Sequence, residues 1–446
     1  MIKPILFVFI IVVSLQGCSL YHERSVPSVP VPKRFPSSMS NSATKVNHLP
    51  YVSWWQQFND AELNRLMECG LQNNMDIHIA LGNLQQAQGE LRQIKLSWIP
   101  MLQLFGGYST NPALGVPGGF YGVWPYYTLN IAKQITLQKQ AKWNVNYYHA
   151  AMDGARLALI GQVASAYLTL MAQQEQLRLL KQLDSDIKEL IALSRKDIQI
   201  GLQNEIDLAP LLVDERLIAA QMKPVEHNIV MSENALRYLI NDNPGKIKSK
   251  NNFARLDFSR IKPGSLPAAV LNNRPDLKMA EYAVRRSYAG IWSAYSDFFP
   301  TLQLDDFIGE AHLPNSTFEQ ATDAYFQGII NPAVFGKVAA RKGTYHAEVA
   351  NYVKTVRRIL KEVDNDFSAN KRFNELYNEN LAAEKDYRHK YELQEGLLKA
   401  GLISYKVLLE SKVYLDNLAL STNQAKLQLA MSMVMLYQDL AGGYKC

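Results

Sequence analysis

The sequence predicts a mainly α-helical protein with a smaller, membrane-inserted β part, in which each chain is an internal duplication. The first observation is a repeat: residues 98–104 (WIPMLQL) recur as 298–304 (FFPTLQL), and Gly201-Leu202 recurs as Gly401-Leu402. A period of 200 residues is far too long for a solenoid. The second observation is that two long stretches, residues 126–209 and the whole chain after Pro332, contain no proline, so unusually long helices are possible there. We therefore expect two similar halves, each with one helical hairpin and one β-hairpin.

The N-terminus predicts the compartment. Lys3 and an apolar run from Ile5 to Leu15 precede the sequence Leu-Gln-Gly-Cys18, which is typical of a cleaved signal and not of a membrane span. The last four residues resemble a bacterial lipobox, so we expect residues 1–17 to be removed and Cys18 to carry a covalent lipid. Ser19 is not the aspartate that retains lipoproteins in the inner membrane, which favours the outer membrane. The alternative is an ordinary signal peptide with an incidental cysteine.

Composition narrows the functional class. The formal net charge of +6 is too small to indicate nucleic-acid binding. After the leader, no apolar run approaches the roughly 20 residues of a helical span, so we expect strands to cross any membrane.

Cys69 and Cys446 could form a disulfide in an oxidising periplasm; the alternative is a buried free Cys69 and a frayed C-terminal tail.

The chain divides by composition and periodicity. Residues 18–50 are rich in proline and predict an extended tether. Residues 51–240 form the first repeat, in which Asp60 caps a helix to about Ser97 and a second helix runs from about Lys139 to Ile200, roughly 90 Å long. We expect Pro210 and Pro224 to break the returning arm. The apolar stripe of the long helix has one phase shift and comprises Ile160, Val163, Tyr167, Leu170 and Leu177, then Leu180, Leu183, Ile187 and Leu190.

Residues 241–275 form a linker, and residues 270–446 the second repeat, with a helical hairpin at about 335–442. Both helical hairpins reverse at the same kind of turn. A glycine, Gly201 or Gly401, can end a helix in the left-handed conformation, and the following leucine can close back onto the last turn. Asn204 and Ser404 can cap the next helix.

The opposite end of each half predicts a β-hairpin, at about 101–131 and about 301–331, entered through Pro100 and Pro300. Alternating apolar residues mark the outgoing strands. Four strands cannot close a barrel, and an open edge is not tolerated in lipid, so several copies must close one together. The first return strand is rich in aromatics and predicts an interfacial belt formed by Tyr121, Trp124, Tyr126 and Tyr127.

These motifs together resemble the TolC family of outer-membrane efflux ducts, in its lipoprotein branch. The resemblance covers essentially the whole mature chain and rests on residues 54–63 (WWQQFNDAEL), 273–281 (NRPDLKMAE), Phe299-Pro300 and 436–444 (LYQDLAGGY). It implies a homotrimer whose twelve strands form one outer-membrane β-barrel, continued by a long α-helical coiled-coil barrel across the periplasm. It also implies a passive exit duct for small molecules such as drugs, docked to a periplasmic adaptor and an inner-membrane transporter.

In that family the helical tips close the periplasmic end. The positions that match the tips here run from Gly201 to Asp207 and from Gly401 to Tyr405. Ile403 stands where the family commonly has an aspartate, so the resemblance does not extend to an acidic constriction at the second hairpin. The gate candidates are Gly201, Glu205, Asp207, Gly401 and Tyr405, with Leu402 and Ile403 as an apolar plug; alternatively, Glu205 and Asp207 only support a helix start.

Two further departures from the family pattern concern the β part. One carboxylate of Asp305-Asp306 must face outward, which we expect near the periplasmic rim or against a neighbouring chain. The usual glycine turn before the first long helix is missing from residues 135–139 (ITLQK), so a shifted strand-to-helix junction is expected.

Other classes of protein have weaker support. The eight histidines include no HExxH motif, and no G-x-S-x-G, Walker or dinucleotide motif is present, so we expect no catalytic residue, no metal and no cofactor apart from the lipid on Cys18. The rival interpretations are a periplasm-spanning coiled-coil lipoprotein or adaptor that forms no pore, and the duct of a type I protein secretion system. The cargo and the class of pump stay open.

Overall fold

The computed structural model describes residues 25–32, 35–37, 46–110, 118–248, 251–256, 268–311, 317–328 and 331–445. The predicted signal peptide, the lipid-bearing Cys18 and the expected turn near Pro314 lie outside these residues. The chain separates into two compact units. Unit 1 comprises Met1–Pro30, Ala80–Met152 and Asp276–Val356, and unit 2 comprises Val31–Ile79, Asp153–Pro275 and Arg357–Cys446. Each unit takes segments from both expected repeats.

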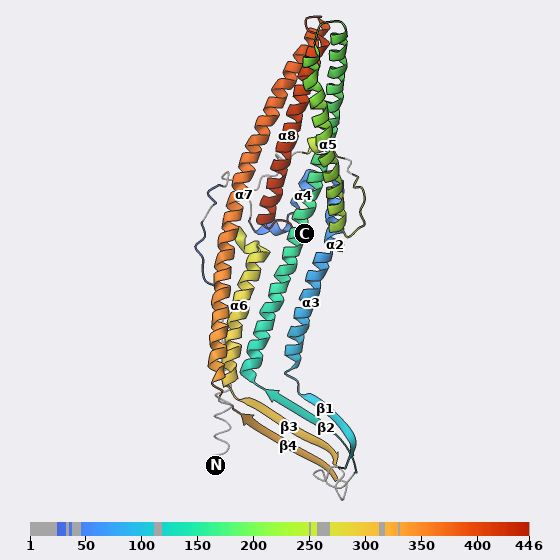
Figure 1. Ribbon diagram of the computed structural model, residues 1–446. Coiled ribbons are helices and arrows are strands. Elements are labelled where there is room, and N and C mark those ends of the chain that lie inside the picture. The colour runs from blue at the N-terminus through green and yellow to red at the C-terminus, as the bar shows by residue number, and fades with distance from the viewer. Residues whose placement is uncertain are drawn as a thin grey trace. The chain divides into compact units, whose positions relative to one another are not determined.

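Unit 1 contains an antiparallel sheet of four strands, in the order β1-β2-β3-β4 (Figure 1). The strands are β1 (Met101–Ser109), β2 (Gly118–Leu129), β3 (Thr301–Ala311) and β4 (Thr317–Gln327). Leu102 lies opposite Pro125, Leu129 opposite Leu302, and Leu302 opposite Phe326. The two hairpins expected from the sequence therefore join through β2 and β3, and β1 and β4 form the edges of the described sheet.

Long helices make up most of the remaining described chain. They are α2 (Ala61–Asn73), α3 (Met75–Leu96), α4 (Ile131–Gln199), α5 (Glu205–Leu239), α6 (Pro275–Tyr295), α7 (Ala333–Lys399) and α8 (Tyr405–Asp439). Short 3₁₀ turns are η2 (Val46–Tyr51), η3 (Trp54–Phe58), η5 (Phe253–Arg255), η6 (Ala268–Asn273) and η7 (Ser296–Phe298). Helices α3, α4 and α7 contribute residues to both units.

The helix expected from Asp60 to Ser97 is in fact two helices, which is a correction to the sequence prediction. Asp60 caps α2 as expected, because its Oδ1 accepts from the Glu62 and Leu63 amides at 2.9 and 3.0 Å. Asn74 then adopts an extended conformation, and its side-chain oxygen accepts from the amides of Asp76 and Ile77. An asparagine that caps a new helix start competes with the continuing helix, and this ends α2.

The first long helix begins eight residues earlier than the predicted Lys139, directly after β2. Asn130 makes this junction. Its Oδ1 accepts from the Lys133 amide at 2.9 Å, while its Nδ2 donates to the carbonyls of Ser296 and Phe299 at 2.9 and 3.1 Å. One side chain thus caps α4 and ties it to the segment that enters β3, so no glycine turn is needed.

Pro210 and Pro224 do not break α5, contrary to the prediction. Both lie inside a continuous helix of 35 residues. Each proline removes one backbone hydrogen bond, but α5 is held by packing: Ile218 and Val225 are buried against α4. Tertiary contacts therefore outweigh the local preference.

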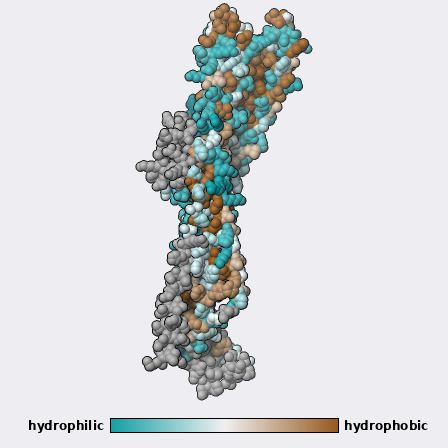
Figure 2. Space-filling model, turned by 90° about the vertical axis from the view of Figure 1, so that its left-hand side faces the viewer, coloured by the Kyte–Doolittle hydropathy of each residue, from teal (hydrophilic) through white to brown (hydrophobic). Residues whose placement is uncertain are grey.

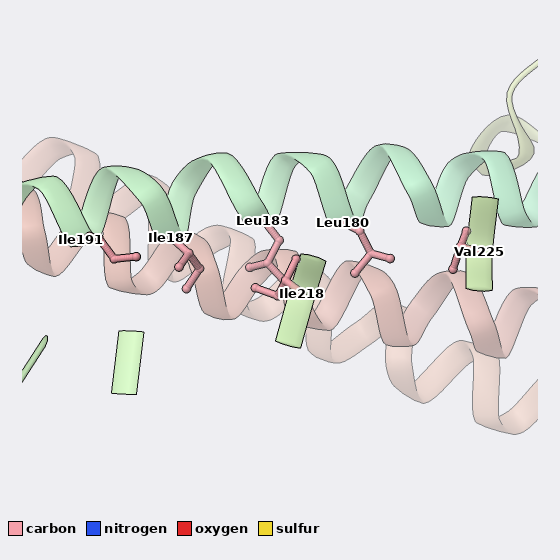
Figure 3. Close-up of a cluster of buried hydrophobic side chains, with 6 residues drawn as sticks. All are labelled: Leu180, Leu183, Ile187, Ile191, Ile218 and Val225. Atoms are coloured by element: carbon pink, nitrogen blue, oxygen red, sulfur yellow. The ribbon is translucent and has the colours of Figure 1, made fainter. Parts of the chain in front are cut away.

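The predicted apolar stripe of α4 is confirmed as a buried surface. In unit 2, Leu180, Leu183, Ile187 and Ile191 project from one side of α4 and form a cluster with Ile218 and Val225 of α5 (Figure 3). Ile160, Val163, Tyr167 and Leu170 of the earlier part of the stripe are also buried. The phase shift between the two runs lets the buried face follow the neighbouring helices along α4.

One stretch of α4 corrects the expectation about apolar runs. Among the described helices, α4 alone contains 18 residues that are long and apolar enough, by composition, to cross a membrane. However, 56% of that stretch is buried within the protein, as in a core helix. Its apolar character is therefore explained by packing.

The segments that carry the family resemblance meet in unit 2, although they are far apart in the sequence. The Trp54 ring stacks on Tyr437 with ring centroids 5.1 Å apart, and the Tyr444 hydroxyl donates to the Asn273 carbonyl at 2.8 Å. The guanidinium of Arg274 donates to the Asp439 carbonyl at 2.9 Å. The motifs at residues 54–63, 273–281 and 436–444 are therefore parts of one core in unit 2, in which the first tryptophan motif packs against the C-terminal motif.

The tether and the cysteines each show one further feature. Phe35 of the tether is buried against Phe367 of α7, and the Ser37 amide donates to Asp364 Oδ1 at 2.9 Å. The tether is thus docked at this point, whereas the sequence predicted only an extended run. Cys69 is partly exposed and unpaired with any described cysteine; Cys446 lies outside the described residues, so the possible disulfide between them stays a prediction.

Candidate functional site

The sheet of unit 1 has two chemically different faces, fixed by the alternation of strand residues and by the pairing register. One face, which we call the apolar face, carries Leu102, Leu104, Tyr108, Tyr121, Val123, Tyr127, Leu129, Leu302, Leu304, Ile308 and Phe326. The other, the polar face, carries Gln103, Phe105, Phe120, Trp124, Tyr126, Thr128, Gln303, Asp305, Asp323, Tyr325 and Gln327. Leu104 is 76% exposed within the single chain. A sheet with one broadly apolar exposed face is suited to contact lipid.

The register divides the predicted aromatic belt, and this corrects the prediction. Tyr121 and Tyr127 lie on the apolar face, whereas Trp124 and Tyr126 lie on the polar face. Tyr121 and Tyr127 stand an even number of residues apart, as do Trp124 and Tyr126, but the two pairs are offset by an odd number, so they face opposite sides because successive side chains alternate. The composition of the strand indicated an interface, but only the pairing shows which two aromatics are available on the apolar side.

The polar face is packed by aromatics over glycines. Phe105 lies opposite Gly122 across β1 and β2, and its ring contacts Phe120 and Trp124 with centroids 6.0 and 6.3 Å away. A Cβ on Gly122 would lie 2.8 Å from both the Phe105 ring and the Ile308 carbonyl oxygen. Gly122 therefore allows the close approach of β3, and Phe105 covers the space that the missing side chain leaves.

The two adjacent aspartates of β3 face opposite sides. Asp305 lies on the polar face and accepts a hydrogen bond from the Trp124 indole. Asp306 lies on the apolar face and accepts from the Thr322 hydroxyl at 2.8 Å. It is a central residue of β3, an internal strand of the described sheet, so it does not lie on an edge strand where a neighbouring chain could pair. The other expected position, near the periplasmic rim, stays a prediction. The hydroxyl of Thr322, directly opposite, instead lowers the cost of this charge.

The tips of the helical hairpins in unit 2 have the backbone geometry that the sequence predicts. Gly201 and Gly401 have φ of +81° and +73°. After α4, the Leu202 amide donates to the Asp197 carbonyl and the Gly201 amide to the Ile198 carbonyl, at 2.8 and 3.0 Å. The turn after α7 repeats this pattern. Both helices therefore end in Schellman motifs, which satisfy their last carbonyl groups.

The helices that leave the tips are capped as expected. The side-chain oxygen of Asn204 accepts from the amides of Ile206 and Asp207, and the Asp207 carboxylate accepts from the Asn204 amide, which completes a capping box. Ser404 Oγ accepts from the Val407 amide at 3.4 Å. Asp207 thus has a clear structural role, while Glu205 is exposed.

The predicted closure of the leucine side chains is wrong, and this changes the surface of the tips. Leu202 and Leu402 are 73% and 71% exposed, because the motif closes through the backbone without burying the side chain. Ile206 is also exposed, whereas Ile403 is half-buried. Figure 2 shows hydrophobic surface at the ends of both hairpins. The tips therefore present apolar side chains, and their role as a plug stays a prediction.

Two contacts join α8 to α4 just below the tips. The Tyr405 hydroxyl donates to Glu189 Oε1 at 2.9 Å, and this bond raises the pKa of Tyr405. Lys406 Nζ lies 3.7 Å from Asp197 Oδ2. Tyr405 was predicted as a gate residue, but Glu189, Asp197 and Lys406 were not. Their partners lie about 200 residues away in sequence, so only the hairpin pairing could identify them.

Among the described residues, no group of three or more His, Cys, Asp or Glu side chains is placed to hold a metal ion. The two surfaces are an exposed apolar sheet face and a pair of helical tips. Both are features of binding and assembly surfaces.

Comparison with known proteins identifies the class. The family model described as "Outer membrane efflux protein" matches residues 66–240 and again residues 266–442. The chain therefore belongs to the outer membrane efflux protein family. It is an outer-membrane channel component of an efflux system, and its place is the outer membrane.

Individual proteins agree with this assignment over nearly the whole chain. The toluene efflux pump outer membrane protein TtgC of Pseudomonas putida is 24% identical over 100% of this chain and 96% of its own. The probable outer membrane lipoprotein SilC of Salmonella typhimurium is 22% identical over 96% of each chain. The fold resembles the open state of the Neisseria gonorrhoeae MtrE outer membrane channel, with a TM-score of 0.82 at 20% identity, over 95% of this chain and 98% of that chain.

Proposed function

We propose that three copies of this chain assemble into one continuous duct, through which small molecules pass passively from the periplasm to the exterior. Each copy contributes four strands to a twelve-stranded barrel and its helical hairpins to a coiled-coil barrel. The two matches to one family model and the repeated Schellman turns support the view that each chain arose by duplication. Because the chain is a conduit, we expect no catalytic activity.

The observation that carries this proposal is the four-stranded sheet. Its strands of 9, 12, 11 and 11 residues suit the roughly 9–11 residues of a tilted membrane strand. Unpaired backbone groups at the edges, β1 and β4, would be very costly in lipid. Pairing β1 of one copy with β4 of the next removes both edges. The apolar face then contacts lipid, and the polar face lines the lumen.

The remaining parts of the proposal concern partners and anchoring. The exposed apolar tips would dock with a periplasmic adaptor that connects the duct to an inner-membrane transporter, since an apolar surface of this kind is more costly in water than in a contact. A lipid on Cys18 would add a second membrane attachment. One relative is named for toluene efflux, which supports a small-molecule cargo for this chain.

The pairing of edge strands can be tested by cysteine crosslinking in membranes. In a background that carries Cys69→Ser and Cys446→Ser, Gln103→Cys in β1 is combined in turn with Asp323→Cys, Tyr325→Cys or Gln327→Cys in β4, which samples the register. We expect at least one pair to yield covalent dimers and trimers on oxidation. If oxidation leaves the protein monomeric for every cysteine pair, the proposal is contradicted.

A matched control uses two internal strands. Thr128 and Gln303 lie directly opposite each other in β2 and β3, so the pair Thr128→Cys and Gln303→Cys should link within one chain and leave the apparent mass unchanged. Purified protein reconstituted in a planar bilayer should also conduct ions. Absence of conductance from well-folded trimers would leave the assembly intact but contradict the open duct.

A further inference from the structure

Two carboxyl groups meet at the contact between α4 and α8 in unit 2. Asp186 of α4 is 2% exposed and accepts from Lys412 Nζ of α8 at 2.8 Å. Asp416 follows one helical turn after Lys412, on the same side of α8; its carboxyl interacts with that of Asp186, and its Oδ2 is fully buried, with no hydrogen-bond partner among the described residues. Two ionised carboxylates both act only as acceptors. The contact therefore requires a proton shared by the pair.

The surrounding donors show which carboxyl holds the proton. Lys412 Nζ lies 2.8 Å from Asp186 Oδ1, and Gln182 Nε2 lies 3.2 Å from each oxygen of Asp186. Asp186 thus has the partners of an ionised carboxylate, and the proton resides on Asp416. Burial, followed by the hydrogen bond and the charge of Asp186, raises the pKa of Asp416 to about 7, although Lys412 and Arg178 oppose the shift.

The neighbouring helices place both charged and apolar side chains around Asp186 and Asp416. Arg178 of α4 is held by Glu175 at 2.7 Å, and Tyr391 of α7 faces Lys412. Burial lowers the pKa of Lys412, but the hydrogen bond and charge of Asp186 outweigh this and raise it. Helix α5 supplies apolar side chains to the same region, among them Leu208, Leu211, Leu212 and Ile218. The two cations that act on Asp416, Lys412 and Arg178, already pair with Asp186 and Glu175, so a second negative charge here would not have a cation to itself.

We propose that Asp416 and Asp186 form a proton-operated latch that holds α8 on α4. The latch is closed while the shared proton is present. Loss of the proton places two negative charges side by side in a largely buried site. The segment of α8 between Tyr405 and Asp416, which follows the tip turn, is then released from α4. An effect of this release on the passage of small molecules rests on the proposed duct. The latch between α4 and α8 does not depend on that proposal.

Proton linkage gives the expected size of the effect. Opening returns Asp416 to the ordinary aspartate pKa of 3.8, so each opening event releases one proton. The opening constant should therefore rise about tenfold per pH unit between about pH 5 and pH 7, and should level off above about pH 7. The effect is opposite to that of a salt-bridged carboxylate, whose contribution is lost as the pH falls.

The test is native-state amide hydrogen exchange on the full-length protein in detergent, at pH 5, 6, 7 and 8, corrected for intrinsic exchange rates. Amides of residues 405–416 should show the tenfold slope. Amides in the middle of α5 provide an internal reference and should show none. A flat profile in α8, or the same slope in α5, would overturn the proposal, since the latter indicates global unfolding.

Variants assign the slope to the pair. Asp416→Asn keeps the shape and donates an N–H to Asp186 without a titratable proton, so the slope in α8 should disappear and the segment should stay protected at pH 8. The matched control is Asp214→Asn, an exposed aspartate on α5, which should keep the wild-type slope. If Asp416→Asn folds poorly, Asp186→Asn should also reduce the slope, because Asp416 then loses the charge that holds its proton. Retention of the full slope in both pair variants would overturn the assignment.

Discussion

Gly443 shows how one residue of a C-terminal motif is dictated by its surroundings. Its φ is +87°, and a Cβ there would lie 2.6 Å from the Trp55 ring and 3.1 Å from the Val52 carbonyl oxygen. Its amide donates to the Leu49 carbonyl at 2.9 Å. Both the backbone conformation and the space therefore exclude a side chain. The glycine lets the end of the chain close over the first tryptophan motif.

We expect Gly443→Ala to destabilise the protein by about 1–3 kcal/mol, from the cost of a left-handed alanine and of displacing Trp55. Thermal unfolding of detergent-solubilised protein measures the change as a lower transition midpoint. The control is Gly396→Ala on α7, where no atom lies within 4 Å of the new Cβ; this change should be neutral or stabilise by about 0.5–1 kcal/mol. Equal midpoints for the two variants would contradict the steric argument.

Arg274 illustrates a second kind of residue-level constraint. It is buried, and its guanidinium lies 3.2 Å from Asp439 Oδ1 and 3.7 Å from Glu362 Oε2. Burial and a hydrogen bond to Asp439 raise the pKa of the adjacent Asp366 to about 8. One arginine thus organises three carboxyl groups where α7 and α8 meet, and the sequence motif alone did not indicate these partners.

At the scale of elements, the contact between β2 and β3 joins the two hairpins into one sheet. Gly122 and Gly309 are paired across it, and both the Ile308 carbonyl and the Gly309 Cα lie close to the position of a Cβ on Gly122. Backbone atoms cannot move aside as a flexible side chain can. This single position therefore sets how closely the two halves of the sheet approach.

We expect Gly122→Ala to weaken or shift the pairing of β2 with β3 and to reduce the yield of folded, heat-modifiable protein in the outer membrane severalfold. The measurement is the fraction of the membrane protein that migrates as the unheated species on electrophoresis. Gly119→Ala is the control, since the nearest atom to its Cβ lies at 3.8 Å; it should assemble normally. Normal assembly of Gly122→Ala as well would show that the sheet tolerates the displacement.

Elements were predictable to different degrees from the sequence. The tip turns were correct in position because glycine and the capping residues act locally. Helix continuity was less predictable: Asn74 divides a periodic segment, and Pro210 and Pro224 leave α5 intact. The reason is that caps, packing and lost hydrogen bonds differ by only about 1–3 kcal/mol, and tertiary contacts decide between them.

At the scale of the molecule, two independent attachments to the membrane are expected, the lipid on Cys18 and the sheet. We predict that Cys18→Ala removes the lipid but leaves most of the protein in the membrane, because the exposed apolar face of the sheet remains. Fractionation with and without detergent measures the distribution. Monomeric protein released without detergent would contradict a membrane-inserted sheet and favour a pore-free lipoprotein.

The sequence by itself determined the family, the compartment, the two hairpins of each kind and the turns that end the long helices. These features depend on local chemistry and on motifs that survive as strings of residues. The tertiary structure decided which aromatics lie on the apolar face of the sheet, that Asp306 of the internal strand β3 faces Thr322 of β4, and that Asp186, Lys412 and Asp416 meet. Such contacts join residues up to 230 positions apart, and only strand register and helix packing, which depend on the whole fold, bring them together.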